Sequence, residues 1–180
     1  MSNERIAILG NAGGGKSTLA RQLAAARELP LTEVDKLLWK PGWVEASDDA
    51  FEAEHGPLIA GESWIIEGMG KLDSIRPRLL RATWIIFIDM VLWQHFWLAA
   101  ERQIKQEMGK LEHPIAGLSE PISTRAMFET LWDTEQDWMP TIRANVDEAE
   151  AVGIKVVRIG SVDELNAFAE TVDKEAERTG

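Results

Sequence analysis

The stretch "ILGNAGGGKSTLA", Ile8–Ala20, decides the fold. It matches the spacing G-x-x-x-x-G-K-[ST] with Gly10, Gly15, Lys16 and Ser17. The apolar run "RIAIL" precedes it, and the helical pattern "STLARQLAAARE" follows it. A strand, a glycine-rich loop and a helix in this order are the context in which the spacing identifies a phosphate-binding loop. The sequence therefore predicts a phosphate site near the start of the chain.

Each part of this loop has an expected task. The glycines let backbone N–H groups turn inward around a β-phosphate, and the start of the following helix adds partial positive charge. Lys16 is expected to reach the β- and γ-phosphates, and the Ser17 hydroxyl to bind Mg²⁺. Thr18 is interpreted as an ordinary residue of the first helical turn, close enough to touch the α-phosphate. With ATP and Mg²⁺ as cofactors, the expected nucleotide-binding residues are Gly10, Asn11, Ala12, Gly13, Gly14, Gly15, Lys16, Ser17 and Thr18.

Short apolar runs alternate with amphipathic helical stretches along the chain. This pattern is typical of a parallel sheet with crossover helices. The expected strands are Arg5–Leu9, Leu31–Val34, Trp64–Glu67, Trp84–Ile88 and Ile154–Ile159. A chain of 180 residues can bury a sizeable core. The sequence therefore predicts one α/β domain over residues 1–180, built on a doubly wound five-stranded parallel sheet.

Two long helices are expected in the second half of the chain. The first covers "VLWQHFWLAAERQIKQEM", and we interpret its apolar stripe as core packing; the stripe comprises Trp93, Phe96, Trp97, Ala100 and Ile104. Trp93 and Trp97 become interface candidates only if they are exposed. The second helix runs from Thr124 toward Ala149, and Pro140 is expected to kink or divide it. Its apolar positions are Phe128, Leu131, Trp132, Trp138, Ile142 and Val146.

The stretch Gly109–Ser123 has no periodicity and contains two glycines and two prolines. We expect a long loop there, and in a compact domain such a loop is often a lid. The expected lid spans residues 105–125.

Composition excludes several classes of protein. The formal net charge is -11, from 30 acidic and 19 basic residues, which repels nucleic acid over most of the surface. The densest basic cluster, "RPRLLR" at Arg76–Arg81, is interpreted as a solvated helix face, with a local basic groove as the alternative. The absence of cysteine excludes disulfides and zinc–thiolate sites. The start lacks a signal-peptide pattern and no apolar run has membrane-spanning length, so we expect a soluble, cytoplasmic protein.

Two acidic residues at strand ends compete for a place near the metal ion. Glu67 ends one expected strand and Asp89 follows another. Both would lie at the carboxyl edge of the sheet, where ligands bind in such folds. Asp89 directly precedes a helical pattern, so a helix N-cap is its alternative role. We prefer Glu67 as the residue that holds a metal-bound water, although a carboxylate there can also bond a neighbouring loop.

A third acidic residue, Asp35, follows the second expected strand in "LTEVDKLLWKPGW". It should lie across the crevice from Lys16, where a carboxylate could orient or deprotonate an acceptor hydroxyl. Its alternative role is to cap the short helix "KLLW". Trp39 and Trp43 could stack on a planar acceptor or pack beneath a turn. Glu33 is interpreted as structural.

The phosphate loop, "VDKLLWKPGW", "WIIEGMG" and "RPRLLRATWIIFID" together resemble the small P-loop kinases called DNA topology modulation proteins (FlaR-like), relatives of adenylate and shikimate kinases. The resemblance runs from Arg5 to Arg102. It implies the P-loop nucleoside triphosphate hydrolase fold with a helical lid and the strand order 2-3-1-4-5. The same resemblance implies ATP on the loop, an acidic residue near Mg²⁺ at Glu67 and an acceptor site near Asp35. It also implies arginines that close on the phosphates, matched by position at Arg102 and Arg78.

The sequence departs from this family in two places. Members usually have aspartate where this chain has Glu67, and they have an arginine-rich lid. Here the lid region offers only Lys105, Lys110 and Arg125 as cations. Because lid arginines stabilise the transferring phosphoryl group, this scarcity argues against fast turnover.

Three functions remain open. The first is a kinase that transfers the γ-phosphoryl group of ATP to a small acceptor such as a nucleoside, a nucleotide or another hydroxyl or phosphate compound. The second is a nucleotide-binding regulator with slow or no hydrolysis, which an exposed tryptophan patch would favour. The third is a nucleic-acid-linked ATPase, against which the acidic charge and short chain argue. The acceptor, the base preference and the oligomeric state are not predicted, and His55, His95 and His113 have no ligand spacing.

Overall fold

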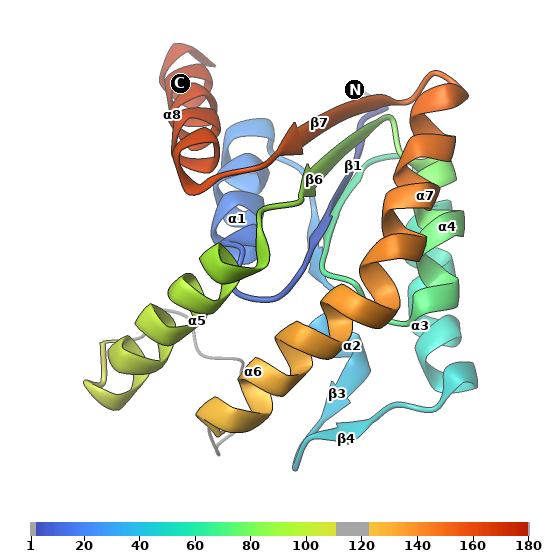
Figure 1. The fold of residues 1–180 in the computed structure, drawn as a ribbon. Coiled ribbons are helices and arrows are strands. Elements are labelled where there is room, and N and C mark those ends of the chain that lie inside the picture. The colour runs from blue at the N-terminus through green and yellow to red at the C-terminus, as the bar shows by residue number, and fades with distance from the viewer. Residues whose placement is uncertain (1–2, 111–122, 180) are drawn as a thin grey trace.

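Five parallel strands form the central sheet (Figure 1). The order across the sheet is β2-β5-β1-β6-β7. Counted along the chain among these five strands, this is 2-3-1-4-5, so the predicted order is confirmed. The strands are β1 (Arg5–Gly10), β2 (Leu31–Glu33), β5 (Trp64–Glu67), β6 (Trp84–Ile88) and β7 (Lys155–Ile159). The structure, a computed structural model, describes residues 3–110 and 123–179.

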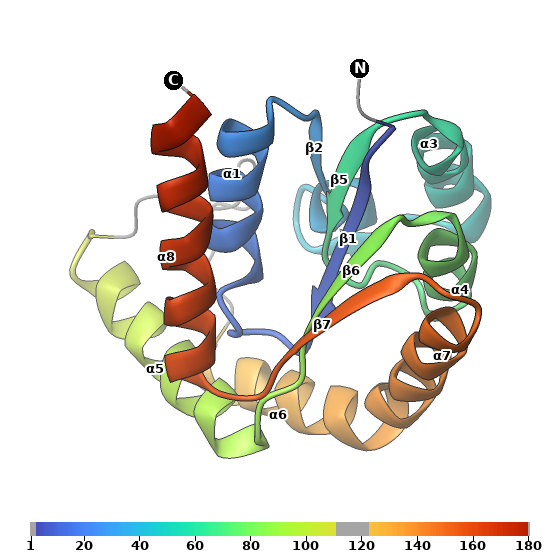
Figure 2. The ribbon, with the colours of Figure 1, turned by 90° about the horizontal axis from the view of Figure 1, so that it is seen from above.

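Helices cover both faces of the sheet (Figure 2). One face carries α1 (Lys16–Arg27) and α8 (Val162–Thr179). The other carries α3 (Asp48–Ala60), α4 (Leu72–Arg81) and α7 (Met139–Ala151). This is the doubly wound α/β arrangement of the P-loop nucleoside triphosphate hydrolase fold, as predicted.

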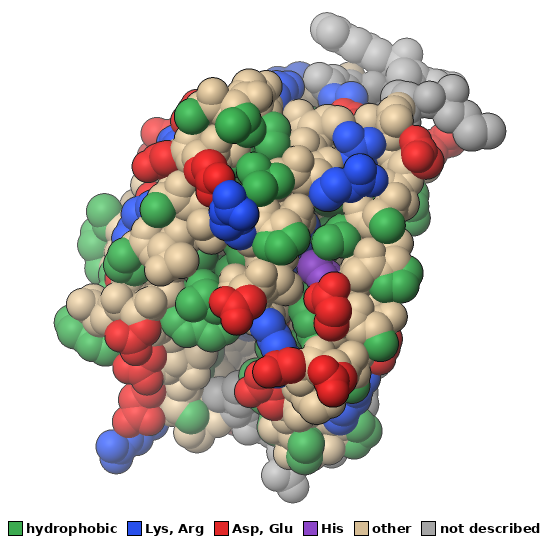
Figure 3. All heavy atoms as spheres, turned by 90° about the vertical axis from the view of Figure 1, so that its right-hand side faces the viewer, with side chains coloured by type: hydrophobic (Ala, Val, Ile, Leu, Met, Phe, Trp, Pro, Cys, Tyr) green, Lys and Arg blue, Asp and Glu red, His purple; other side chains and the backbone are tan. Residues whose placement is uncertain are grey.

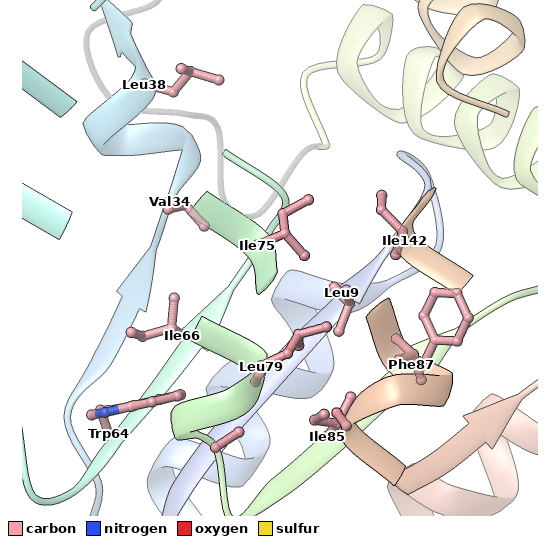
Figure 4. Close-up of a cluster of buried hydrophobic side chains, with 14 of the residues drawn as sticks. Leu9, Val34, Leu38, Trp64, Ile66, Ile75, Leu79, Ile85, Phe87 and Ile142 are labelled. Atoms are coloured by element: carbon pink, nitrogen blue, oxygen red, sulfur yellow. The ribbon is translucent and has the colours of Figure 1, made fainter. Parts of the chain in front are cut away.

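Alternation along the strands gives each face its own core. In β1, Ala7 and Leu9 join the buried cluster beneath α3, α4 and α7, which Figure 4 shows from within. Ile6 and Ile8 point the other way and pack with Leu19 and Leu23 of α1. Because both faces are buried, every side chain of β5 and β6 is buried as well, including the carboxylate of Glu67.

A small substructure follows β2 at the carboxyl edge of the sheet. It comprises the one-turn helix α2 (Asp35–Leu38) and an antiparallel hairpin of β3 (Trp39–Lys40) and β4 (Val44–Glu45). The hairpin turns at Gly42, whose φ of 81° favours glycine. The sequence pattern does not predict this hairpin, because two-residue strands are too short to show alternation.

The predicted helix from Thr124 is divided, as expected. It consists of α6 (Thr124–Asp133), the π-helical segment η1 (Thr134–Trp138) and α7, and Pro140 lies in the first turn of α7. Proline is tolerated there because the first-turn N–H has no helical partner. The central part of the predicted lid, residues 111–122 with His113, lies outside the described residues.

The interpretation of the apolar stripe on α5 (Leu92–Glu107) as core is wrong. Trp93 is 64% exposed, Trp97 68% and Ile104 60%. The helix instead buries His95 and Ala99 on its opposite side. Periodicity shows that one side of a helix is apolar, but it does not show what covers that side.

Within residues 3–110 and 123–179, no helix is long and apolar enough to cross a membrane.

Candidate functional site

The phosphate loop joins β1 to α1 and passes close to neighbouring backbone. Gly10 has a φ of 147°, and a Cβ there would lie 2.2 Å from the Ile88 carbonyl oxygen. Gly13 has a φ of 71°, and its Cβ would lie 2.9 Å from the His95 carbonyl oxygen. A larger residue at Gly10 would clash with β6, and one at Gly13 would clash with α5. These two positions therefore require glycine for both conformation and space.

Hydrogen bonds within the loop and to α6 hold its backbone conformation. The Asn11 side-chain amide donates to the Leu131 carbonyl oxygen at 2.9 Å, and its side-chain oxygen accepts from the Ala12 N–H at 2.8 Å. The Lys16 ammonium donates to the Asn11 carbonyl oxygen at 2.9 Å, so it lies over the loop. Helix α1 begins at Lys16 with no side-chain cap. Its first N–H groups and the lysine therefore form an anion-binding arrangement.

His95 supports this loop from α5, a role that sequence reasoning missed. Its Nδ1 lies 2.8 Å from the Ala12 carbonyl oxygen, and because a carbonyl only accepts, Nδ1 carries the hydrogen. Burial lowers the pKa of His95, and the nearby Lys16 ammonium acts in the same direction. The ring is therefore neutral at physiological pH. Histidine spacing could not reveal this contact, which joins residues 83 positions apart.

Glu67 lies beside the loop at the end of β5 and is 2% exposed. Burial raises the pKa of Glu67; Lys16 and a hydrogen bond from Ser17 oppose this shift, whereas the negative charge of Asp35 adds to it. Register explains the proximity, since Ile8 of β1 is aligned with Glu67. The structure therefore brings together the predicted residues Lys16, Ser17, Glu67 and Asp35.

The Ser17 hydroxyl and the Glu67 carboxylate fit a magnesium ion. Both offer oxygen, the ligand type that Mg²⁺ prefers, and a buried carboxylate with a raised pKa gains from a neighbouring cation. In the described part of the chain, no group of three or more His, Asp or Glu side chains could hold a metal alone. A bound Mg²⁺ would thus take its remaining ligands from phosphate and water, as it commonly does.

Asp35 begins α2, one turn of helix at the carboxyl edge of β2. Residue Val34 is the N-cap of α2, so the capping role considered for Asp35 is wrong. A Cβ built on Gly68 would lie 3.6 Å from Asp35 Oδ1, which places the carboxylate beside the loop that follows Glu67. The Asp35 side chain is half-buried and therefore open to a ligand in the crevice.

Asp89 is held by a partner that sequence reasoning missed. The N-cap of α5 is Val91, so the capping role considered for Asp89 is wrong. Its two carboxylate oxygens instead accept hydrogen bonds from Arg143 of α7, at 2.7 and 3.1 Å. Arg143 also pairs with Glu135 at 2.7 Å, and these hydrogen bonds, Asp89 first, raise the pKa of Arg143. Asp89 is thus neutralised by α7, whereas Glu67 faces the phosphate loop.

The two arginines carried over from the resemblance lie in different surroundings. Arg78 is fully buried in α4 and donates to the Gly68 and Met69 carbonyl oxygens, at 2.7 and 3.2 Å. It therefore lines no open acceptor site in this structure, but supports the loop after Glu67. Burial lowers the pKa of Arg78 to about 10, so it stays charged at neutral pH. Arg102 is exposed and lies seven residues, two helical turns, after His95 on the loop-facing side of α5.

Two other cations of the region have partners on their own helices. Lys105 pairs with Glu101 at 2.9 Å, and Arg125 pairs with Glu129 at 2.8 Å. These ion pairs hold both side chains along their own helices. Arg102 is the lid-region cation that the helix geometry favours.

Trp39 and Trp43 pack on each other across the β3–β4 hairpin. Their rings meet edge to face with centroids 5.8 Å apart. Trp39 also packs against the buried cluster beneath α3 and α4. The structure therefore supports packing at a turn, the second of the two roles considered for them. Glu33 pairs with Arg21 and Lys36, in agreement with a structural role.

The solvated helix face expected at Arg76–Arg81 is present at Arg76 and Arg81, which are exposed, but not at Arg78. Arg76 pairs with Glu148, Arg78 is buried, and Arg81 donates to the carbonyl oxygens of residues 59 and 60. Figure 3 views the face made by α3, α4 and α7, on which acidic and basic side chains are intermixed. Intermixed charge does not provide the basic stripe that nucleic acid requires.

One open cavity of about 470 Å³ lies on this same face, between α3 and α4, away from the phosphate loop. His55 lines it, stacked on Phe51 with ring centroids 5.1 Å apart. Burial lowers the pKa of His55 to about 4, and the charge of Arg78 acts in the same direction. Neither Ser17 nor Lys16 lines this cavity.

The fold has counterparts among solved structures. A gluconokinase from Sinorhizobium meliloti 1021 aligns with a TM-score of 0.54 and 16% identity, over 98% of this chain and 93% of its own. A shikimate kinase from Acinetobacter baumannii in complex with shikimate aligns with a TM-score of 0.57 and 12% identity, over 94% of this chain and 90% of its own. No protein-family model and no curated protein matches the sequence. At these identities the likeness shows the fold alone: the chain has the fold of P-loop kinases.

Proposed function

We propose that the protein is a kinase that transfers the γ-phosphoryl group of ATP to a small acceptor. The observation that supports this most strongly is the meeting of four side chains at one sheet edge. Lys16 and Ser17 follow the phosphate loop after β1. Glu67 ends β5, and Asp35 is the first residue of α2. A cation, a hydroxyl and two carboxylates in this arrangement match the needs of phosphoryl transfer, which depends on positioning and charge neutralisation.

The groups have separable tasks in this proposal. The loop N–H groups and Lys16 hold the β- and γ-phosphates, and Arg102 approaches them from α5. Bound Mg²⁺, held by Ser17 and by Glu67 directly or through water, would neutralise phosphate charge. Asp35 accepts the proton of an acceptor hydroxyl, and the oxygen of that hydroxyl bonds to the γ-phosphorus. The bond between the γ-phosphorus and the β–γ bridging oxygen breaks, and ADP leaves.

The acceptor class follows from the open polar groups of the crevice. Asp35 favours a hydroxyl donor, and Arg78 is buried and closed to an acidic group in this structure. A neutral polyol, a sugar or the sugar hydroxyl of a nucleoside therefore fits better than a doubly charged phosphate. Two structures with the same fold are named gluconokinase and shikimate kinase, so the hydroxylated acids gluconate and shikimate are tested beside the neutral compounds. Membership of the topology modulation family is part of this proposal and rests on the sequence resemblance.

An acceptor panel tests the proposal. We expect ADP release from ATP and Mg²⁺ to rise on adding one member of a panel of nucleosides, nucleotides, sugars and sugar acids, including gluconate and shikimate. We expect Lys16→Ala to abolish that rise. ATP binding without stimulation by any member would contradict the kinase and favour the alternative, a nucleotide-binding regulator. That alternative is supported by the exposed Trp93 and Trp97 on α5.

A further inference from the structure

The exposed side of α5 is an apolar surface that the proposed kinase site does not explain. Four side chains form it, which we call the α5 stripe: Trp93, Trp97, Ile104 and Met108. Each is between 59% and 68% exposed, and two are tryptophans. Helix α5 leaves the sheet and extends to the periphery of the molecule (Figure 1). Contiguous apolar patches of this kind on a soluble domain mark interaction sites.

The stripe points away from the phosphate loop. His95 and Ala99, which contact the loop region, lie on the buried side of α5, about half a turn from the stripe. Phe96 lies between the two sides and packs on Phe128 of α6, with ring centroids 5.0 Å apart. Neither nucleotide nor acceptor at the loop could therefore cover the tryptophans.

The spacing of the stripe is self-complementary. The pair Trp93 and Met108 and the pair Trp97 and Ile104 share one midpoint, between Ala100 and Glu101. In an antiparallel pair of α5 helices, one two-fold axis at this midpoint sets each tryptophan against an aliphatic side chain of the other copy. The small Ala100 at the axis permits close approach of the two helices.

The charge of α5 also favours a second copy. The chain has a formal net charge of -11, so most faces of two copies repel. Helix α5 has two acidic and two basic residues, namely Glu101, Glu107, Arg102 and Lys105, and thus no net charge. Glu101, the acidic residue beside the midpoint, is already paired with Lys105 at 2.9 Å. An uncharged apolar stripe offers no attraction to nucleic acid or to an acidic or basic partner.

We propose that the α5 stripe is a homodimer interface in which two α5 helices pack antiparallel about a two-fold axis at Ala100. The stripe spans about 22 Å along the helix, from the rise per residue. Packing of the four side chains of each copy would bury on the order of 1,000 Å² of accessible surface over both copies. This area is at the lower limit for a specific interface. The dimer is therefore weak and concentration-dependent. This proposal is independent of the proposed kinase activity.

Sedimentation velocity of the full chain without nucleotide, over a concentration series, tests the dimer. Wild type should shift from monomer to dimer as concentration rises. Trp97→Glu should raise the dimer dissociation constant at least about 30-fold, as expected for a central tryptophan. Val152 is the C-cap of α7 and is 67% exposed, so Val152→Glu places the same charge on another exposed apolar position. This variant should leave the dimer dissociation constant unchanged. Far-UV circular dichroism and thermal melting should show that both variants fold.

The absence of cysteine allows a direct test of the axis. Under mild oxidation, Ala100→Cys should form a disulfide-linked dimer faster than Val152→Cys, because disulfides need Cα atoms within about 7 Å. Adding Trp97→Glu to Ala100→Cys should remove this advantage. The proposal is overturned by a wild type that stays monomeric throughout, by a dimer that survives Trp97→Glu, or by equal cross-linking rates at residues 100 and 152.

Discussion

The hydroxyl of Ser17, in the phosphate loop, donates a hydrogen bond to the buried carboxylate of Glu67 at the end of the neighbouring strand. This contact joins the loop after β1 to β5, and it exists because the two strands are adjacent and in register. Burial of the Glu67 carboxylate destabilises its ionised form, and this carboxylate lies where a cation would bind. Such a cost is typical of functional sites rather than of structural ion pairs.

Replacing Glu67 should stabilise the protein without ligand. Burial raises the pKa of Glu67, so its ionised form opposes folding above that pKa, and Glu67→Gln removes this cost at neutral pH. We expect a rise in Tm on the order of a few degrees. The same variant should lose the Mg²⁺ dependence of ATP binding. Thermal melts at pH 7.5 and calorimetric titrations with and without Mg²⁺ measure the two effects.

Glu33→Gln is the matched control, since Glu33 ends the adjacent strand β2. Burial acts to raise the pKa of Glu33, but hydrogen bonds from Lys36 and Arg21 outweigh it and leave that pKa lowered. This substitution should therefore lower Tm and leave the Mg²⁺ dependence intact. A Glu67→Gln protein that melts below wild type would show that Glu67 is structural.

Asp35→Asn should separate acceptor chemistry from nucleotide binding. Asparagine keeps the shape of the side chain but is a far weaker proton acceptor. We expect acceptor-stimulated turnover to fall by about 10²- to 10⁴-fold, the usual contribution of a general base, with ATP affinity unchanged. Steady-state rates and a parallel ATP titration check this. A loss of ATP affinity would instead assign Asp35 to the metal or to the fold.

His95→Ala should weaken nucleotide binding through the loop. The imidazole donates to the Ala12 carbonyl oxygen at 2.8 Å, and without it the loop loses a support on α5. One neutral hydrogen bond corresponds to a roughly 3- to 10-fold weaker ATP affinity. His55→Ala removes another buried histidine, far from the loop, and should leave ATP affinity as in wild type. Equal affinities for the two variants would refute the supporting role of His95.

Acid should destabilise the fold through His55. Its pKa is about 4 in the folded protein and 6.5 unfolded, so the unfolded state binds more protons between these values. The contribution of neutral His55 to the free energy of unfolding is fully present above pH 6.5 and is lost as the pH falls toward 4. From pH 7.5 to 5.5 we expect a loss of about 1 kcal/mol from this group. Urea unfolding at both values measures it, and His55→Phe, which keeps the stack on Phe51, should reduce the loss. An undiminished loss in this variant would assign the pH effect elsewhere.

Local pattern was sufficient to predict the loop and the five strands, and the family resemblance implied their order. Gly10, Gly15, Lys16 and Ser17 define their site within eight residues, and the strand pattern identified β5, where Glu67 lies. The contacts that support the site connect distant segments. His95 reaches Ala12 across 83 positions, and Arg143 reaches Asp89 across 54. No periodicity encodes such pairs, which depend on how helices pack against the sheet edge.

Burial was the property that sequence predicted least well. The stripe with Trp93 and Trp97 has the spacing of a core helix, yet it is exposed. Arg78 belongs to a cluster typical of a solvated helix, yet it is fully buried beneath the loop after β5. The stripe stays exposed because no described element packs over it, whereas Arg78 is buried by the loop about ten residues before it. The composition of a helix alone predicts neither outcome.

The most direct test of the proposed kinase follows the γ-phosphoryl group itself. Wild type and Lys16→Ala are incubated with ATP labelled at the γ-position, Mg²⁺ and each panel compound, and the products are separated. The account predicts label on one hydroxyl acceptor with wild type and none with Lys16→Ala. Label that remains in ATP, or appears only as inorganic phosphate with every compound, would contradict it.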